Sequence, residues 1–410
     1  MLRPKSVTEW MNQSADVPAI WYLKRLSAND TLATGAHQAG PYIPKEVIFR
    51  AFPGLNDPSK ENPRCQFRLL IDSHGQERQA TAIWYNNWLR GGTRDEARIT
   101  NLGGRQSVLL DPESTGSLVV FVFPTPEHGS STAVHVWVAR SPEEEAEIES
   151  RFGPVDPGQT VIWPVPTTVE GKPHGCFLRE DEIPPEWRSH FPAPEEMLQK
   201  ALELRPACDA PVDIRLLERR ECEYRIFRSL EEILVLPRIR KEFLSIEDFL
   251  EQAQTVLQRR KSRSGRSLEL HVKQILQEEG FREGKDFVHG EESDPGTGKR
   301  PDFLFPSVEA YHNRSFPEDL LRMLAVKTTC RDRWRQVLNE ADRIRVKHLL
   351  TLQEGVSETQ FREMKDAGVR LVVPAPLKPK FPKAIQPELL SLGDFIKQLR
   401  VLQQSWARVL

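Results

Sequence analysis

Three side chains in the carboxy-terminal half of the chain have the chemistry to hydrolyse a phosphodiester bond. Pro301-Asp302 opens a predicted strand, Lys327 ends the next predicted strand, and Glu340 follows on a predicted helix. Carboxylates can hold Mg²⁺ beside a scissile phosphate, and a lysine can orient water or stabilise the developing charge. The pattern predicts a magnesium-dependent centre with Asp302 and Glu340 as metal ligands.

Each of these residues alone has an ordinary explanation. Pro-Asp and Val-Lys pairs occur by chance, and an isolated Glu340 would be a solvated helix residue. Their joint spacing, together with the run Arg331-Asp332-Arg333 between Lys327 and Glu340, favours the catalytic interpretation.

The arrangement resembles the Pro-Asp…(Asp/Glu)-x-Lys nuclease superfamily. Its second acid normally stands two residues before the lysine, where this chain has Ala325, which cannot bind a cation. A subset of restriction endonucleases moves this acid to the following helix, with the spacing Lys-x3-Arg-(Asp/Glu)-Arg-x6-Glu, and residues 327–340 fit it throughout. Glu269, in a probable helix, resembles the auxiliary metal-site glutamate of the superfamily.

The run Arg331-Asp332-Arg333 has the side chains needed to read a GG:CC step. Arginines pair with guanine O6 and N7, and a carboxylate accepts from the cytosine N4 amine. An ion pair on a charged helix surface is the alternative. A predicted helix near 331–346 would place Arg333 and Glu340 on nearly the same side and so couple reading rigidly to cutting.

A basic segment in the same half predicts contacts with DNA phosphates. Such contacts position a duplex without reading its sequence, and a solvated basic loop explains any single side chain equally well. Its basic residues are Arg259, Arg260, Lys261, Arg263 and Arg266.

Whole stretches between about residues 20 and 400 resemble the EcoRII family of restriction endonucleases. They include residues 24–31, 267–271, 301–307, 324–330 and 369–374. The resemblance implies a type IIE enzyme, a homodimer that uses Mg²⁺, cleaves double-stranded DNA at CCWGG-like sites and is stimulated by a second copy of the site. Arg331 stands where lysine is expected in that family.

The resemblance also implies roles for further residues. Arg220 and Tyr224 resemble the pair that accommodates bases swung out of the stack, although this spacing also occurs in ordinary helix packing. The residues that would contact effector DNA are His37, Tyr42, Arg94, Glu96 and Arg98. Gly92 and Ala97 stand near positions where basic residues are expected, which implies weaker effector binding or other contact groups. Without the resemblance, residues 94–98 would be a charged turn.

The distribution of patterns along the chain predicts two domains. Short β-type runs at 47–52, 66–71, 82–85, 117–123 and 133–138 predict a small barrel or sandwich, and a proline-rich stretch follows. Helical patterns at 216–236 and 246–258 then lead into alternating strands (301–305, 321–327, 348–352, 370–373) and helices (331–346, 357–366, 389–403). With the resemblance, we expect a B3-like, mainly-β pseudobarrel over residues 1–175, a linker over 176–205, and an α/β nuclease domain with a mixed central sheet over 206–410.

Composition is that of an ordinary globular protein. The 410 residues carry a net charge of −2, so attraction to DNA must come from local basic patches. Five singly scattered cysteines predict reduced thiols, and no apolar run suits a signal peptide or membrane span, so we expect a cytoplasmic protein without membrane contacts. Two other functions remain open: a sequence-specific DNA-binding regulator without cleavage, and a nuclease selective for DNA structure.

Overall fold

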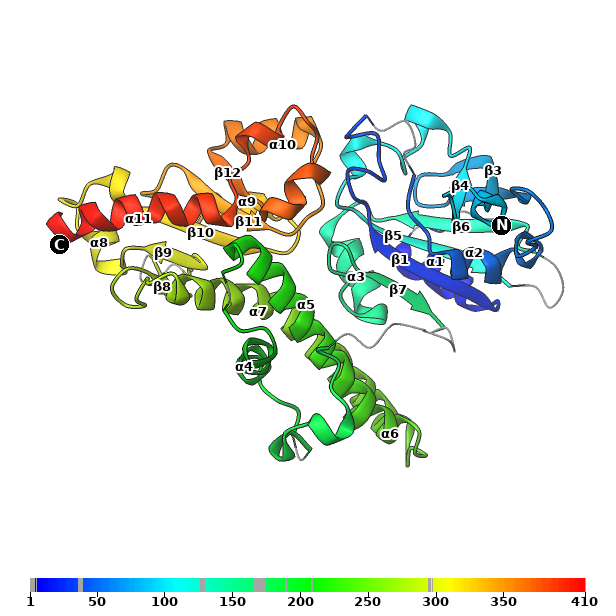
Figure 1. Ribbon diagram of the computed structural model, residues 1–410, viewed down its shortest axis with the longest axis horizontal. Coiled ribbons are helices and arrows are strands. Elements are labelled where there is room, and N and C mark those ends of the chain that lie inside the picture. Colours follow the sequence, from blue (N-terminus) through cyan, green and yellow to red (C-terminus); the bar gives the residue numbers. More distant parts are fainter. Residues whose placement is uncertain are drawn as a thin grey trace. The chain divides into compact units, whose positions relative to one another are not determined.

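The computed structural model describes residues 4, 6–35, 40–125, 130–164, 175–188, 190–207, 209–293, 296 and 298–409. The chain divides into two compact units (Figure 1). The first comprises Met1–Thr168, Gln353–Arg362 and Pro379–Pro387, and the second Val169–Leu352, Glu363–Lys378 and Glu388–Leu410. No helix in the described ranges is long and apolar enough to cross a membrane.

A seven-stranded mixed sheet forms the first unit, in the order β4-β3-β2-β6-β5-β1-β7. Among the described strands of this sheet, only β2 and β6 pair in parallel. The strands are β1 (Ala19–Arg25), β2 (Arg64–Ile71), β3 (Gln76–Tyr85), β4 (Glu96–Thr100), β5 (Leu118–Pro124), β6 (Ala133–Val138) and β7 (Thr160–Trp163). The mainly-β pseudobarrel expected from the sequence is confirmed, and four of the five predicted β-runs lie in strands.

Alternation along the central strands explains why this sheet has a core on both faces. In β1, Ile20 and Tyr22 enter one core, while Trp21 and Leu23 enter the other. Helix α2 (Lys45–Ala51) packs into the first core, and helices α1 (Val7–Ala15) and α3 (Pro142–Phe152) pack into the second.

The strand predicted at 47–52 is wrong, because these residues form most of α2. The buried positions Val47, Ile48 and Ala51 follow a helical spacing. Periodicity cannot distinguish a buried strand from a helix in so short an apolar run.

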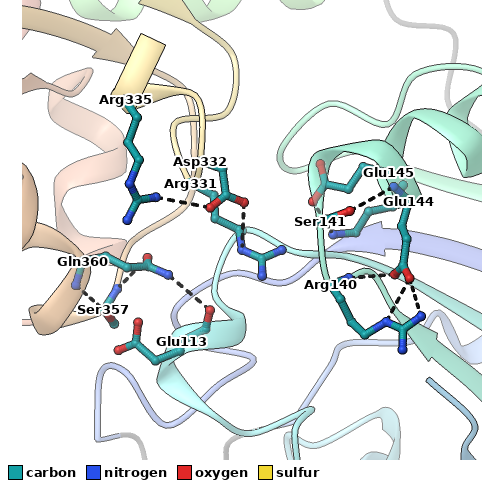
Figure 2. A network of polar contacts seen from close by, with 12 residues as sticks. Glu113, Arg140, Ser141, Glu144, Glu145, Arg331, Asp332, Arg335, Ser357 and Gln360 are labelled. Carbon is teal, nitrogen blue, oxygen red and sulfur yellow. Dashed lines mark hydrogen bonds and ion pairs between the residues drawn. The ribbon is translucent and has the colours of Figure 1, made fainter. Parts of the chain in front are cut away.

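A segment from late in the chain belongs to the first unit. The Ala28 N–H donates to the Glu354 carbonyl at 2.8 Å, and Gln360 Nε2 donates to the Glu113 carbonyl at 3.1 Å (Figure 2). Gly355 has a φ of +108°, and a Cβ there would lie 2.3 Å from the Ala28 Cβ. The close approach of these backbones therefore requires glycine at 355.

Helices make up the first part of the second unit. The elements are α4 (Pro194–Leu204), α5 (Val212–Leu230), a π-helical turn (Glu231–Val235), α6 (Leu236–Ile239) and α7 (Ile246–Glu278). The helices predicted at 216–236 and 246–258 are confirmed, and α7 continues well beyond its predicted end. A disulfide joins Cys176 to Cys222 on α5 within a buried apolar cluster, so the prediction of reduced thiols is wrong for this pair. Their sequence separation of 46 gives no local signal of their proximity.

A five-stranded mixed sheet in the order β12-β11-β10-β9-β8 completes the second unit. Strands β10 (Arg322–Lys327), β11 (Lys347–Thr351) and β12 (Val369–Val372) are parallel, whereas β8 (Val288–His289) and β9 (Phe303–Phe305) are antiparallel. Helices α8 (Val308–His312), α10 (Glu358–Asp366) and α11 (Leu392–Val409) accompany these strands in the chain. All four predicted strands of this half and its last two predicted helices are confirmed.

The helix predicted at 331–346 is wrong. Helix α9 comprises only Trp334–Val337, turns follow, and Ala341 has a positive φ of 47°. Ala341 and Ile344 are nevertheless buried, so the apolar spacing reflects burial in a turn. Arg333 and Glu340 therefore do not lie on one helix.

Candidate active site

Asp302 and Lys327 meet where two antiparallel strands adjoin. Asp302 immediately precedes β9, and Lys327 is the last residue of β10. One carboxylate oxygen, Oδ2 of Asp302, accepts from Lys327 Nζ at 2.9 Å and from the Val326 N–H at 2.6 Å. Burial raises the pKa of Asp302, Lys327 opposes this effect, and Glu269 adds to it. The structure thus joins two of the three residues singled out by their spacing.

Glu340 shares the electrostatic environment of this pair. Burial raises the pKa of Glu340 to about 7. Lys327 and Lys347 lower this pKa, while Asp302 and Glu269 raise it. Its Oε2 atom is buried and has no hydrogen-bond partner. Three mutually repelling carboxyl groups near the Lys327 ammonium, one of them with an unpartnered oxygen, form a donor set that suits a hard divalent cation.

This donor set is not a preformed cage. In the described part of the chain, no three His, Cys, Asp or Glu side chains are grouped closely enough to hold a metal ion. Asp302 and Glu340 would offer two carboxylates, and Mg²⁺ is typically held by one or two carboxylates, with waters and substrate phosphates completing its shell. The residues present therefore fit this cation.

Two residues near this centre carried no recognisable signal in the sequence. His289 in β8 stacks on Phe303, with 4.9 Å between ring centroids, and its Nε2 lies 3.5 Å from Glu269 Oε2 without a hydrogen bond. Lys347 opens β11 and contacts the backbone of Glu340. Both act through tertiary contacts that no sequence spacing encodes.

The three residues predicted to read bases lie in the turn before α9. Asp332 lies between two arginines, with its carboxylate 3.7 Å from Arg331 Nε and 3.5 Å from Arg335 Nη1 (Figure 2). Arg331, Asp332 and Arg333 are all partly exposed. A turn presents these side chains, where the sequence predicted a helix face.

The predicted base-flipping pair lies on α5. Arg220 is buried, whereas Tyr224 is partly exposed, with the Arg263 guanidinium 5.0 Å from the centre of its ring. Arg263 is itself buried and also lies 5.4 Å from the Phe227 ring centre. The Arg263 guanidinium thus packs against the Tyr224 ring, which is the ring expected to stack in place of a flipped base.

The basic segment belongs to helix α7 and makes several contacts within the unit. Arg260 pairs with Glu231 through bonds of 2.7 and 2.9 Å, Arg266 pairs with Glu195 at 2.6 Å, and Arg259 lies 4.8 Å from the Phe191 ring centre. Lys261 is exposed. These side chains lie on a helix, whereas the sequence alternative was a loop.

The predicted effector residues lie in the first unit. His37 is outside the described residues, and the Tyr42 side chain is exposed. Glu96 binds the Nε atoms of Arg94 and Arg98, and the Arg94 guanidinium stacks 3.6 Å from the Tyr85 ring centre. Arg94, just before strand β4, and Glu96 and Arg98 within it therefore form an Arg-Glu-Arg row.

Family models match both halves of the chain. A model described as "Restriction endonuclease EcoRII, N-terminal" matches residues 15–166, and one described as "EcoRII C terminal" matches residues 227–396. The type II restriction enzyme EcoRII of Escherichia coli is 43% identical over 400 residues, which cover 95% of this chain and 96% of that protein.

Solved structures that match part of the chain are more distant. A complex of the restriction endonuclease PspGI with substrate DNA is 18% identical, covers 52% of this chain and 94% of its own, and gives a TM-score of 0.43. The B3 domain of the UbaLAI restriction endonuclease with cognate DNA is 23% identical, covers 37% of this chain and 91% of its own, and gives a TM-score of 0.26.

Proposed function

The chain belongs to the EcoRII family of type II restriction endonucleases, and from this premise we propose that it cleaves double-stranded DNA at CCWGG-like sites by Mg²⁺-dependent phosphodiester hydrolysis. The observation that carries the proposal is the contact of Lys327 with Asp302, beside a Glu340 carboxyl whose Oε2 is buried and unpartnered.

Asp302 and Glu340 would hold the metal in this proposal. Mg²⁺, when bound, polarises the phosphate and lowers the pKa of a coordinated water. Lys327 fixes the Asp302 carboxylate and offers its ammonium to the charge that develops on the phosphate. Glu269 adds negative charge to the site, and His289 lies beside it.

Sequence recognition is proposed for the turn before α9. Arg331 and Arg333 would contact guanine edges and Asp332 a cytosine amine, and a homodimer would apply two copies to the two halves of the site. Tyr224 and Arg220 would receive the flipped central bases. Arg259, Arg260, Lys261, Arg263 and Arg266 are proposed for the phosphates, with Lys261 the most accessible because the others also make contacts within the unit.

We assign effector binding to residues 1–175, with residues 176–205 as linker and residues 206–410 as the nuclease. Tyr42, Arg94, Glu96 and Arg98, together with His37, would contact the second copy of the site. Allosteric stimulation requires a coupling free energy between the two DNA sites. The segment Gln353–Arg362, which follows strand β11 and packs on Ala28 and Glu113, offers a covalent path for it.

Mapping of cleaved plasmid ends tests the function directly. With Mg²⁺, we expect cuts at one sequence class only. A regulator without cleavage would give no cuts, and a structure-selective nuclease would give cuts that follow DNA structure. Either result would reject the proposal.

Replacement of Asp302 tests the catalytic assignment. Asp302→Ala should reduce the cleavage rate by at least about 10³-fold, because the variant lacks a metal ligand, while site-specific binding to a duplex stays measurable. Asp319→Ala, at an exposed aspartate of the same unit, should cleave normally. Normal turnover by Asp302→Ala, with or without weaker binding, would contradict the assigned role.

A further inference from the structure

Lys347 is a buried cation attached to the turn that carries Glu340. It opens strand β11, and only 6% of the residue is exposed. Its Nζ donates to the backbone carbonyls of Glu340, Ala341 and Ile344, at 2.5, 3.0 and 3.0 Å. All three N–H groups of the ammonium are therefore used.

The turn requires such a donor because its backbone leaves the helix early. After α9 ends at Val337, the chain turns and Ala341 takes a positive φ, which a residue with a Cβ rarely adopts. Of the three carbonyls, that of Ala341 also accepts from the Ile344 N–H at 2.9 Å. The Lys347 ammonium gives each of the three a donor in a turn where a continuing helix would supply successive N–H groups.

Other charges near the turn act elsewhere. The Arg343 guanidinium binds the carbonyls of Ala310 and Asn313, and Asp342 pairs with Lys299 at 2.5 Å. Among the described residues, the side chain that donates a hydrogen bond to the Glu340 carbonyl is Lys347. The position of the displaced acid thus depends on a lysine in the neighbouring parallel strand.

We propose that Lys347 is a positioning residue for the metal site: by holding the carbonyls of residues 340, 341 and 344, it fixes the turn that aims the Glu340 carboxylate at the cation. The inference rests on the proposed role of Glu340 as a metal ligand. It accounts for how a carboxylate moved off strand β10, where Ala325 occupies the usual place, is held without a long helix.

The experiment compares Lys347→Met with the wild-type enzyme over a range of Mg²⁺ concentrations. Methionine has similar length but no donor. We expect the Mg²⁺ concentration for half-maximal cleavage to rise about tenfold or more, with affinity for a site-containing duplex unchanged in EDTA. Lys397→Met is the matched control, since the Lys397 side chain is 78% exposed.

A purely structural role gives a different result. Lys347→Met would then lower the thermal unfolding midpoint while the folded enzyme kept the wild-type Mg²⁺ requirement, and this would overturn the inference. If Lys347→Met does not fold, Lys347→Gln, with two N–H donors, should fold and still show a raised requirement. A folded glutamine variant with the wild-type requirement, or loss of folding in both variants, would also overturn it.

Glu340→Gln separates this inference from the proposed function. If Glu340→Gln cleaves normally, the metal-ligand assignment itself fails. If Glu340→Gln is inactive while Lys347→Met has the wild-type Mg²⁺ requirement, only the positioning role fails.

Discussion

Burial is the main reason why the pKa values of Asp302 and Glu340 are raised, because it removes the water that would solvate each carboxylate. Lys327 lowers both pKa values, and the neighbouring carboxyl groups raise them again. A site of this kind is unfavourable for the protein without metal and favourable for a divalent cation. The raised pKa values of Asp302 and Glu340 are thus the thermodynamic counterpart of the proposed metal binding.

This balance predicts a pH-dependent gain in stability for Glu340→Gln. The pKa of Glu340 is about 7 in the folded protein, against an ordinary value of 4.5, so the folded state holds this proton more tightly than the unfolded state. Stability from this group is greatest below about pH 4.5 and is lost as pH rises through 7. In EDTA at pH 8, Glu340→Gln should therefore exceed the wild type by roughly 3 kcal/mol.

Urea unfolding at pH 5 and pH 8 measures this difference. At pH 5, where the wild-type Glu340 carboxyl is largely protonated in the folded state, the free energy of unfolding of Glu340→Gln should exceed that of the wild type by less than about 1 kcal/mol. Saturating Mg²⁺ should stabilise the wild type more than the variant. Equal stabilities of the two proteins at both pH values would contradict the assigned pKa.

At the scale of elements, two short segments outside regular strands and long helices are important for the proposed function. The turn after α9 carries Glu340, and the segment after β11 packs into the first unit. Both depend on unusual backbone: Ala341 has a φ of 47° and Gly355 a φ of 108°. Such conformations persist only where surrounding contacts enforce them.

Gly355→Ala tests the second connection. The new Cβ would lie 2.3 Å from the Ala28 Cβ and 3.0 Å from the Lys380 carbonyl oxygen, in a backbone conformation that disfavours side chains. We expect a loss of about 1–3 kcal/mol in the free energy of unfolding. Gly284→Ala, at a φ of +77° with nothing within 4 Å of its Cβ, is the control and should lose less. Equal losses would show that the contact with Ala28 is unimportant.

For the whole molecule, the net charge of −2 makes DNA binding a local property. The arginines of α7 are largely engaged with Glu231, Glu195 and aromatic rings, so few of them are free of contacts within the unit. Binding strength therefore has to come from specific contacts at the two proposed DNA sites. Coupling between the proposed effector site and the proposed cleavage site would let DNA bound at the first raise the cleavage rate at the second.

Removal of residues 1 to about 200 tests this coupling. If the first unit restrains the nuclease until effector DNA binds, a folded truncation should cleave single-site plasmid faster than the full chain. An added duplex containing the site should accelerate the full chain and leave the truncation unaffected. An unchanged or abolished rate in a folded truncation would argue against restraint by the first unit.

The sequence by itself determined what depends on neighbouring residues. The two-residue alternation that buries Phe67, Leu69 and Ile71 in the predicted run 66–71, and the spacing of Asp302 and Lys327 at strand ends, are local patterns that follow from backbone geometry. The family likewise follows from the sequence, since similarity extends over 95% of the chain.

Contacts between residues that are distant in sequence became apparent only from the tertiary structure. The turn of Glu340 around Lys347, the Cys176–Cys222 disulfide and the packing of Gly355 on Ala28 were all absent from the sequence prediction. The apolar residues of 334–344 suited a helix, yet a lysine from the next strand stabilises a turn there. Contacts between segments distant in sequence override local preference because burial and hydrogen bonding outweigh propensity differences of a few tenths of a kcal/mol per residue.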